Sequence, residues 1–262
     1  MTSLEPAQVA LLAGAALVAG AVNAVAGGGS LISFPALLAV GYPALTANVT
    51  NAVALTPGYF GGTLGYRREL EGQRRRILAL GATSAAGAVL GAFLLVISSA
   101  EFFERVVPFL IFLACGLLAA QTRLARLVQR RREGREGGSP AGRDPHTLPL
   151  FAAQFLAAIY GAYFGAGVGI MMLAILGIFL VDNLQRLNAL KGLLSLLING
   201  IAAVYFILFA NVRWVAVAIM AVTSLLGGQL GVVLARRLND QALRWLVIAF
   251  GVAVGLRLLL AG

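Results

Sequence analysis

The chain has 262 residues, of which 60% are hydrophobic and only 11% are charged, and its mean hydropathy is +0.91. Soluble domains carry about 25% charged residues, so this composition excludes an ordinary soluble protein and indicates a membrane protein. The formal net charge of +10 does not indicate nucleic-acid binding. Its basic residues lie in short loops between apolar runs, where they set the orientation of a protein in a bilayer.

The apolar runs follow one another in the same order in two halves of the chain. Each run is long enough to cross a hydrocarbon layer of about 30 Å as a helix. In the first half, residues 1–125, an interrupted apolar region at 6–40 precedes expected helices at 44–66, 77–98 and 104–125. A polar linker rich in Arg, Gly and Pro occupies 126–147. In the second half, an interrupted region at 148–181 precedes expected helices at 186–209, 213–235 and 241–261.

The two interruptions are the sequence "GGGS" at 27–30 and "GAGVG" at 165–169. A continuous helix over 6–40 would measure about 52 Å, too long for one crossing without strong tilt, so a chain reversal is expected. A hairpin and three crossings in each half make the second half inverted. With reversals, 17 of the 20 Lys and Arg lie on one side, against 14 if both interruptions are kinks. The positive-inside rule then places the linker in the cytoplasm and both termini outside it.

The halves also align residue by residue. At a spacing of 140 positions, Asn48 matches Asn188 and Asn51 matches Lys191, and at a spacing of 138, residues 27–29 match residues 165–167. Inverted repeats of this kind are typical of secondary transporters, whose substrate site lies between the repeats near the middle of the bilayer.

The glycine turns predict an anion site. Backbone that leaves helical geometry inside a membrane needs partners in protein or in a water-filled cavity. The helices that resume near Ser30 and Gly169 point free N–H groups and positive dipole ends toward the turns, and Asn23 lies close by in the sequence. The alternative is that these glycines only permit close helix packing.

Polar residues form a stripe on each of two apolar helices. Asn48 with Asn51, and Asn188 with Lys191, are three residues apart and share a helix face. Lys191 could neutralise an anionic ligand, although a lysine near a helix end can instead extend to the membrane surface. Ser195 and Asn199 continue the second stripe. The expected substrate-binding residues are Asn23, Gly27, Gly28, Gly29, Ser30, Asn48, Asn51, Gly165, Gly167, Gly169, Asn188 and Lys191.

Motifs of other functional classes are not found. The sequence contains no zinc-protease motif, nucleophile elbow or nucleotide-binding loop, so no enzyme activity, cofactor or metal is expected. "GAGVG" lacks the strand and the full glycine spacing of a dinucleotide-binding loop. Without a nucleotide site, the driving force is expected to be an ion gradient, the membrane potential or the gradient of the anion itself.

Three segments together resemble the sulfite exporter TauE/SafE family of membrane permeases. They are residues 23–67, beginning "NAVAGGGSLISFPALL", then "YFGAGVGIMML" at 163–173 and "RLNALKGLLSLLING" at 186–200. The resemblance implies transport of small sulfur-containing anions, such as sulfite, sulfonates or sulfoacetate, across the bacterial inner membrane. Substrate and direction vary within the family.

We therefore expect an all-α integral membrane protein of two inverted repeats, each a glycine-broken helical hairpin followed by three transmembrane helices. Its expected function is that of a secondary transporter working by alternating access. An anion channel and a non-transporting membrane scaffold or assembly factor are the alternatives. The expected partners are a small anionic substrate and the lipid bilayer, without nucleic acid, and a homo-oligomer is left open.

Overall fold

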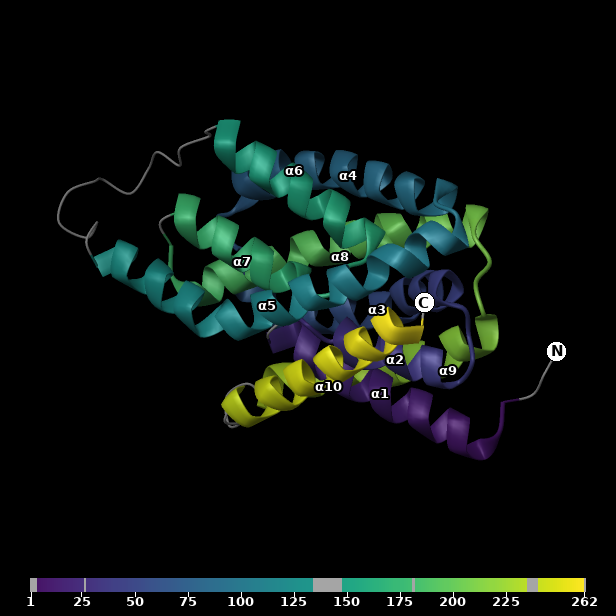
Figure 1. The fold of residues 1–262 in the computed structure, drawn as a ribbon. Helices are drawn as coiled ribbons and strands as arrows, with labels where there is room; N and C mark the ends of the chain where they lie inside the picture. The colour runs from purple at the N-terminus through teal and green to yellow at the C-terminus, as the bar shows by residue number, and fades with distance from the viewer. Residues whose placement is uncertain (1–3, 26, 134–147, 181, 235–239, 262) are drawn as a thin grey trace.

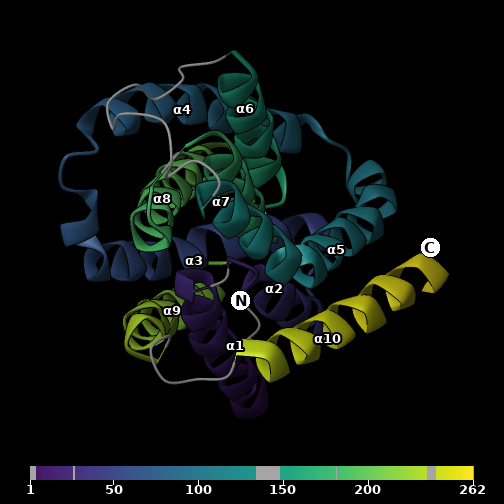
Figure 2. The ribbon, with the colours of Figure 1, turned by 90° about the vertical axis from the view of Figure 1, so that its left-hand side faces the viewer.

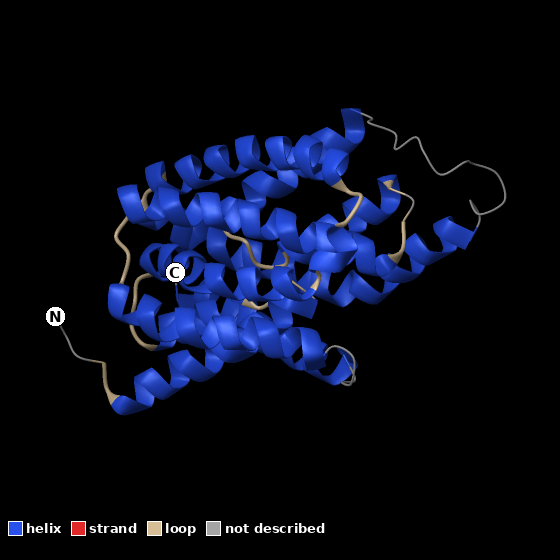
Figure 3. Cartoon of the chain, turned by 180° about the vertical axis from the view of Figure 1, so that it is seen from behind, coloured by secondary structure: helices blue, strands red, loops and turns tan. Residues whose placement is uncertain are grey.

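The computed structural model describes residues 4–25, 27–133, 148–180, 182–234 and 240–261. These residues are almost entirely helical and contain no strand (Figure 3). The helices are α1 (Pro6–Val25), α2 (Ser30–Ala39), α3 (Ala44–Gly65), the short 3-10 helix η1 (Arg67–Leu70), α4 (Arg74–Ile97), α5 (Ala100–Glu133), α6 (Leu148–Tyr163), α7 (Val168–Phe179), α8 (Leu184–Phe209), α9 (Trp214–Leu234) and α10 (Asp240–Ala261).

Five of these helices are long and apolar enough to cross a bilayer, which together with the composition makes this a multi-pass membrane protein. The segments that qualify are Pro6–Ala24, Arg74–Ile97, Ala100–Ala120, Leu184–Phe209 and Trp214–Gly231. Large apolar side chains such as Phe109, Phe209 and Leu260 lie exposed on the outside of the bundle, as expected for a surface in contact with lipid.

Helix α5 is longer than the sequence pattern indicated. It was expected to end at residue 125, but it continues to Glu133 and takes in the first part of the expected linker 126–147. The extension, "RLVQRRRE", consists mainly of residues that favour helix and contains no Gly or Pro. The rest of the expected linker, 134–147, lies outside the described residues.

The packing of the helices follows one rule. Helix α1 packs on α9 and α6 packs on α4, while α3 packs on both α9 and α8, and α8 also packs on α4. Figure 2 shows α4 and α6 on one side of the bundle, α1 and α9 on the other, and α3, α7 and α8 between them. These contacts come in matching pairs. If each helix of the first half is replaced by the helix five places later, and each helix of the second half by the one five places earlier, the contact of α1 with α9 becomes that of α6 with α4. The contact of α3 with α9 becomes that of α8 with α4 in the same way.

The lengths of the short helices α2 and α7 indicate how far into the bilayer the turns that precede them lie. Their 10 and 12 residues correspond to about 15 and 18 Å, roughly half of a hydrocarbon layer of about 30 Å. Gly41 and Pro43, which follow α2, are exposed. We infer that the preceding turn lies near the middle of the bilayer.

The ends of the bundle differ in which chain segments they carry. In Figure 1, α5 ends and α6 begins at the left, on either side of the linker, whereas α1 begins and α10 ends toward the right. Helices α4 and α6 run in the same direction, because Ser84 lies beside Gln154 and Gly91 lies beside Ile159. Helix α4 therefore begins at the end where the linker attaches, which we call the linker side.

Candidate functional site: two glycine turns and a buried lysine

The first turn brings the chain back onto α1. A Cβ atom on Gly29 would fall 2.1 Å from the carbonyl oxygen of Ala19, ten residues earlier, so only glycine permits this approach. The Gly29 N–H donates to Asn23 Oδ1 at 2.7 Å, and both residues are buried. Asn23 thus fixes the turn. The N–H that it binds is not available to a ligand, whereas its own Nδ2 is buried with no hydrogen-bond partner.

The second turn follows the end of α6 and is held by a tyrosine. Tyr160 donates its hydroxyl to the carbonyl of Ala166 at 2.6 Å, and the Gly165 N–H bonds to the carbonyl of Tyr160 at 3.1 Å. Gly165 and Gly167 have φ of +81° and +75°, a conformation that favours glycine. The Asn48 side chain donates to the carbonyl of Tyr163 at 2.9 Å and ties this turn to α3.

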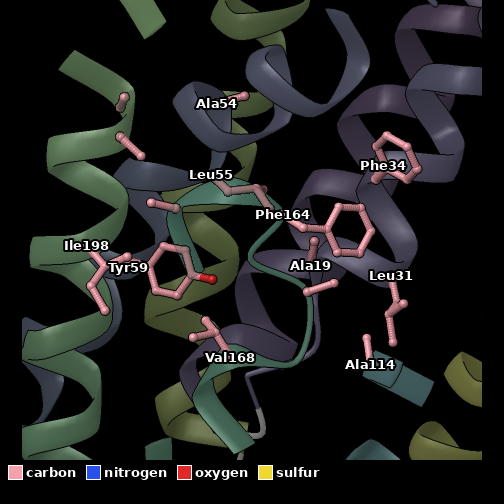
Figure 4. Packing of buried hydrophobic residues seen from close by; sticks show 14 of the residues in the cluster. Ala19, Leu31, Phe34, Ala54, Leu55, Tyr59, Ala114, Phe164, Val168 and Ile198 are labelled. Atoms are coloured by element: carbon pink, nitrogen blue, oxygen red, sulfur yellow. The ribbon is translucent and has the colours of Figure 1, made fainter. Parts of the chain in front are cut away.

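The two turns touch each other directly. A Cβ on Gly27 would lie 2.6 Å from the Gly169 Cα, and a Cβ on Gly169 would lie 2.8 Å from the Gly27 Cα. Phe164 of the second turn packs edge-on against Phe34 of α2, with ring centroids 5.6 Å apart (Figure 4). Because the backbones meet, a ligand has no room directly between Gly27 and Gly169 in this conformation.

Lys191 lies against the beginning of α7. Its Cδ is 3.6 Å from the position that a Gly169 Cβ would take, and the residue is only 2% exposed. Among the described residues it is the one charged side chain classed as buried. A buried ammonium is costly in a membrane and is a default marker of a functional site there. Its placement inside the bundle does not match a lysine that extends to the membrane surface.

The two polar stripes do not converge on one point. Helices α3 and α8 cross antiparallel, with the Thr56 hydroxyl beside the Asn199 carbonyl and Thr63 beside Gly192. Lys191 lies eight residues before Asn199 and Asn51 five residues before Thr56. At about 1.5 Å per residue, Lys191 and Asn51 are therefore separated by about 20 Å along the helices.

The expected residues therefore divide into two groups. Asn188 and Lys191 lie toward the linker side, whereas Asn48 and Asn51 lie toward the opposite side, and the touching turns lie between them. Residues Gly27, Gly28, Gly29, Ser30, Gly165, Gly167 and Gly169 belong to these turns and are all buried.

Unpartnered polar atoms gather on the residues that the sequence singled out. Within the described part of the chain, four buried side-chain atoms lack a hydrogen-bond partner, and three of them belong to Asn23, Asn51 and Asn188. Leaving such an atom unsatisfied costs about 1–3 kcal/mol, so each is a place where a ligand or water would gain a hydrogen bond. The fourth, Gln154 Oε1, lies between α4 and α6.

Three further polar residues at the site carry no signal in the sequence. Tyr59 of α3 lies beside the side chain of Asn199 at the helix crossing, and in Figure 4 its hydroxyl points toward the loop between Phe164 and Val168. Tyr160 spans the second turn, and Thr56 links α3 to α8. An isolated Tyr or Thr in an apolar helix resembles ordinary packing, so periodicity could not have identified them.

Charged side chains lie together at the linker-side start of α8. Asp182 forms ion pairs with Arg76 and with Arg186, the latter at 3.0 Å. Burial alone would raise the pKa of Asp182, but hydrogen bonds from Arg76, Arg186 and the Asn183 backbone outweigh it, and the pKa lies below its ordinary value. In the described segments, no three His, Cys, Asp or Glu residues are grouped as a metal site would require.

Comparison with known proteins identifies the family. The family model described as "Sulfite exporter TauE/SafE" matches residues 12–258. The chain is 27% identical to a probable membrane transporter protein, ORF9, of a Sinorhizobium species, covering 96% of this chain and 92% of that protein. It is 28% identical to a probable membrane transporter protein of Haemophilus influenzae, with coverage of 92% and 90%. It is 25% identical to the probable membrane transporter protein YfcA of Escherichia coli K12, with coverage of 98% and 91%.

No solved structure matches the chain. The family model spans nearly all of the sequence, including both glycine turns and both polar stripes. The chain therefore belongs to the sulfite exporter TauE/SafE family.

Proposed function

We propose that this protein is a secondary transporter that moves small sulfur-containing anions, such as sulfite, sulfonates or sulfoacetate, across the bacterial inner membrane by alternating access. The observation that carries the proposal is the contact of two glycine turns inside a membrane bundle, with the buried Lys191 against one of them. An ammonium in a water-poor interior favours an anion strongly, and the positive end of the α7 helix dipole lies beside it.

The proposal includes an inverted repeat, α1–α5 against α6–α10. Two observations support it. The starts of α2 and α7, Ser30 and Val168, are 138 residues apart, and the starts of α3 and α8, Ala44 and Leu184, are 140 apart, the same spacings at which the sequence motifs align. The exchange of helix contacts between the halves is what a two-fold axis in the membrane plane would produce.

The anion is proposed to bind beside the turn contact, between Lys191 and the beginning of α7. Asn188, one turn before Lys191 on α8, carries an unpartnered Oδ1, and rotation of its amide would present the NH₂ group to an anion. Asn23 Nδ2 is a further unpartnered donor at the first turn. Asn48 is assigned a different role, because its side chain already binds the Tyr163 carbonyl.

The test is flux of sulfite into liposomes that contain the purified protein. Lys191→Gln removes the charge with little change in length, and a lost charge-assisted hydrogen bond is worth about 1.5–3 kcal/mol. We therefore expect sulfite flux to fall by at least about tenfold. Arg105→Gln, at an exposed position near the start of α5, is the matched control for loss of one positive charge and should leave flux unchanged.

The form of the flux separates the functional classes. Saturable exchange with counterflow would support a carrier, and unsaturable flux that follows the membrane potential would indicate a channel. Undiminished flux in Lys191→Gln would remove Lys191 from the site. A protein that moves no sulfur-containing anion would favour a scaffold, which the glycine packing alone could serve.

A further inference from the structure

A hydrogen-bonded cluster joins the two halves of the chain at the linker side, and we call it the latch. It consists of Gln73 and Arg76 from the first half and Asp182 and Arg186 from the second. Arg76 and Asp182 form an ion pair in which the side chains are 14% and 15% exposed. Arg186 holds the same carboxylate, with its Nε 3.0 Å from Asp182 Oδ1.

Main-chain groups extend the latch across the connection between α3 and α4. Arg186 Nη1 donates to the carbonyl of Glu71 at 3.0 Å. The Gln73 side chain, 1% exposed, donates to the carbonyls of Glu69 at 2.8 Å and Arg186 at 3.1 Å. Both guanidinium groups and the Gln73 amide thus tie the loop before α4 to the start of α8, and partly buried charge-assisted bonds of this kind are stronger than exposed pairs.

The latch stands between Lys191 and the linker side. Arg186 precedes Lys191 by five residues on α8, which corresponds to about 7.5 Å along the helix. Arg76 lies in the first turn of α4, at the end of the bundle where the linker attaches. An anion leaving Lys191 toward the linker side would have to pass the segments that the latch holds together.

The corresponding loops at the other end of the bundle are joined more weakly. The connection between α8 and α9 meets the connection between α2 and α3 through Arg213, whose guanidinium lies over the Tyr42 ring at 5.9 Å from its centroid. The Arg213 side chain is exposed, and an exposed cation–π contact is worth only about 0.5–1 kcal/mol. One hydrogen bond accompanies it, from the Arg213 backbone N–H to the hydroxyl oxygen of the Thr50 side chain at 3.1 Å.

The geometry points to a gate: the latch closes the linker side of the transport path and must open in each cycle, while the Arg213–Tyr42 contact is the weaker gate of the opposite side. The inference rests on the proposed alternating-access function. Asp182 and Arg76 are assigned here to the gate and not to anion binding, because each already satisfies the charge of the other.

The experiment measures access to the level of Lys191 without depending on transport. A reporter cysteine replaces Gly192 in a Cys115→Ala background. A Cβ at Gly192 meets only Thr63 Oγ1 at 3.7 Å, so the substitution fits. The purified full-length protein in detergent is treated with a charged methanethiosulfonate reagent, which reacts with water-accessible thiols. We expect slow labelling with the latch intact and labelling about tenfold faster in Asp182→Asn.

Controls make the result specific to the latch. Arg76→Gln should accelerate labelling in the same direction as Asp182→Asn, and the double variant should be no faster than Asp182→Asn alone, because that variant already removes the Arg76–Asp182 pair. Arg75→Gln, an exposed arginine on the same turn of α4, should leave the rate unchanged. If Asp182→Asn does not elute as a single species, Arg76→Gln carries the test from the other end of the pair.

Two readouts separate this inference from the function on which it rests. If the background protein transports sulfite but neither latch variant changes the labelling rate, the gate is refuted and the proposed transport function stands. If the latch variants are labelled faster but the protein transports no anion, the latch is still the barrier between Lys191 and the linker side. The proposed transport function is then refuted. Equal acceleration by Arg75→Gln would also overturn the gate, since any loss of charge would then suffice.

Discussion

The contact between the two turns gives the sharpest prediction. In Gly169→Ala, the new methyl would lie 2.8 Å from the Gly27 Cα, whereas carbon atoms pack at about 3.5–4.0 Å. The turns must separate by about 0.7 Å or more, and overpacking of this kind costs about 1–3 kcal/mol. The neighbouring atom is backbone on a turn with its own hydrogen bonds, so it cannot move aside as a flexible side chain would.

Gly200→Ala is the matched control for this substitution. Gly200 lies inside α8 with no atom within 4 Å of its Cβ position, so alanine there should stabilise the helix by about 0.5–1 kcal/mol. The melting temperatures of the two purified variants, followed by circular dichroism, should differ by at least about 3 °C. If Gly169→Ala melts at or above Gly200→Ala, the two turns are not in contact and the central arrangement described above is wrong.

Three further predictions concern the turn, the latch and the orientation. Asn23→Ala should lower stability by about 1–3 kcal/mol in chemical unfolding, because it removes the bond that fixes the first turn; an unchanged midpoint would contradict that role. The lowered pKa of Asp182 means that its ionised form stabilises the fold above the unfolded pKa of about 4, and that this contribution is lost as pH falls through the folded pKa. The melting temperature of the native protein should therefore drop more steeply below pH 4 than that of Asp182→Asn, and parallel curves would refute the linkage. In a cysteine-free background, a cysteine at Ser139 should be labelled only from the cytoplasm and one at Thr2 only from outside, whereas labelling of both from one side would reject the inverted repeat.

Composition and run length were enough to predict an all-helical protein with several membrane-spanning helices. A run of about 20 apolar residues has few alternatives to a membrane helix, because every backbone polar group must be satisfied within the segment. The glycine turns were also visible, since consecutive glycines interrupt such a run at a defined place. The sequence was less informative at the end of α5. The polar residues up to Glu133 are compatible both with a solvent-exposed linker and with a continuing helix, so they do not show where the helix ends.

The arrangement of the site residues was beyond the reach of the sequence. Periodicity shows that Asn48 and Asn51 share a face, as do Asn188 and Lys191, but it does not show where α3 and α8 cross. That crossing separates the two pairs and leaves Lys191 beside α7 while Asn48 binds the end of α6. The latch was hidden for the same reason. Arg76 and Asp182 are 106 residues apart, and only the packing of α8 against η1 and α4 brings them together.

The crossing itself bears on the proposed symmetry. In a pair of helices related by a two-fold axis, a residue lies beside its own repeat mate only where the axis passes between them. Tyr59 and Asn199 lie side by side at the crossing of α3 and α8, and their spacing is the same 140 residues that relates Asn48 to Asn188. The spacing from the motifs and the position of the crossing are independent of each other. Their agreement supports a proposed axis that passes close to Tyr59 and Asn199, near the second glycine turn, where a Gly165 Cβ would lie 4.0 Å from Asn199 Oδ1.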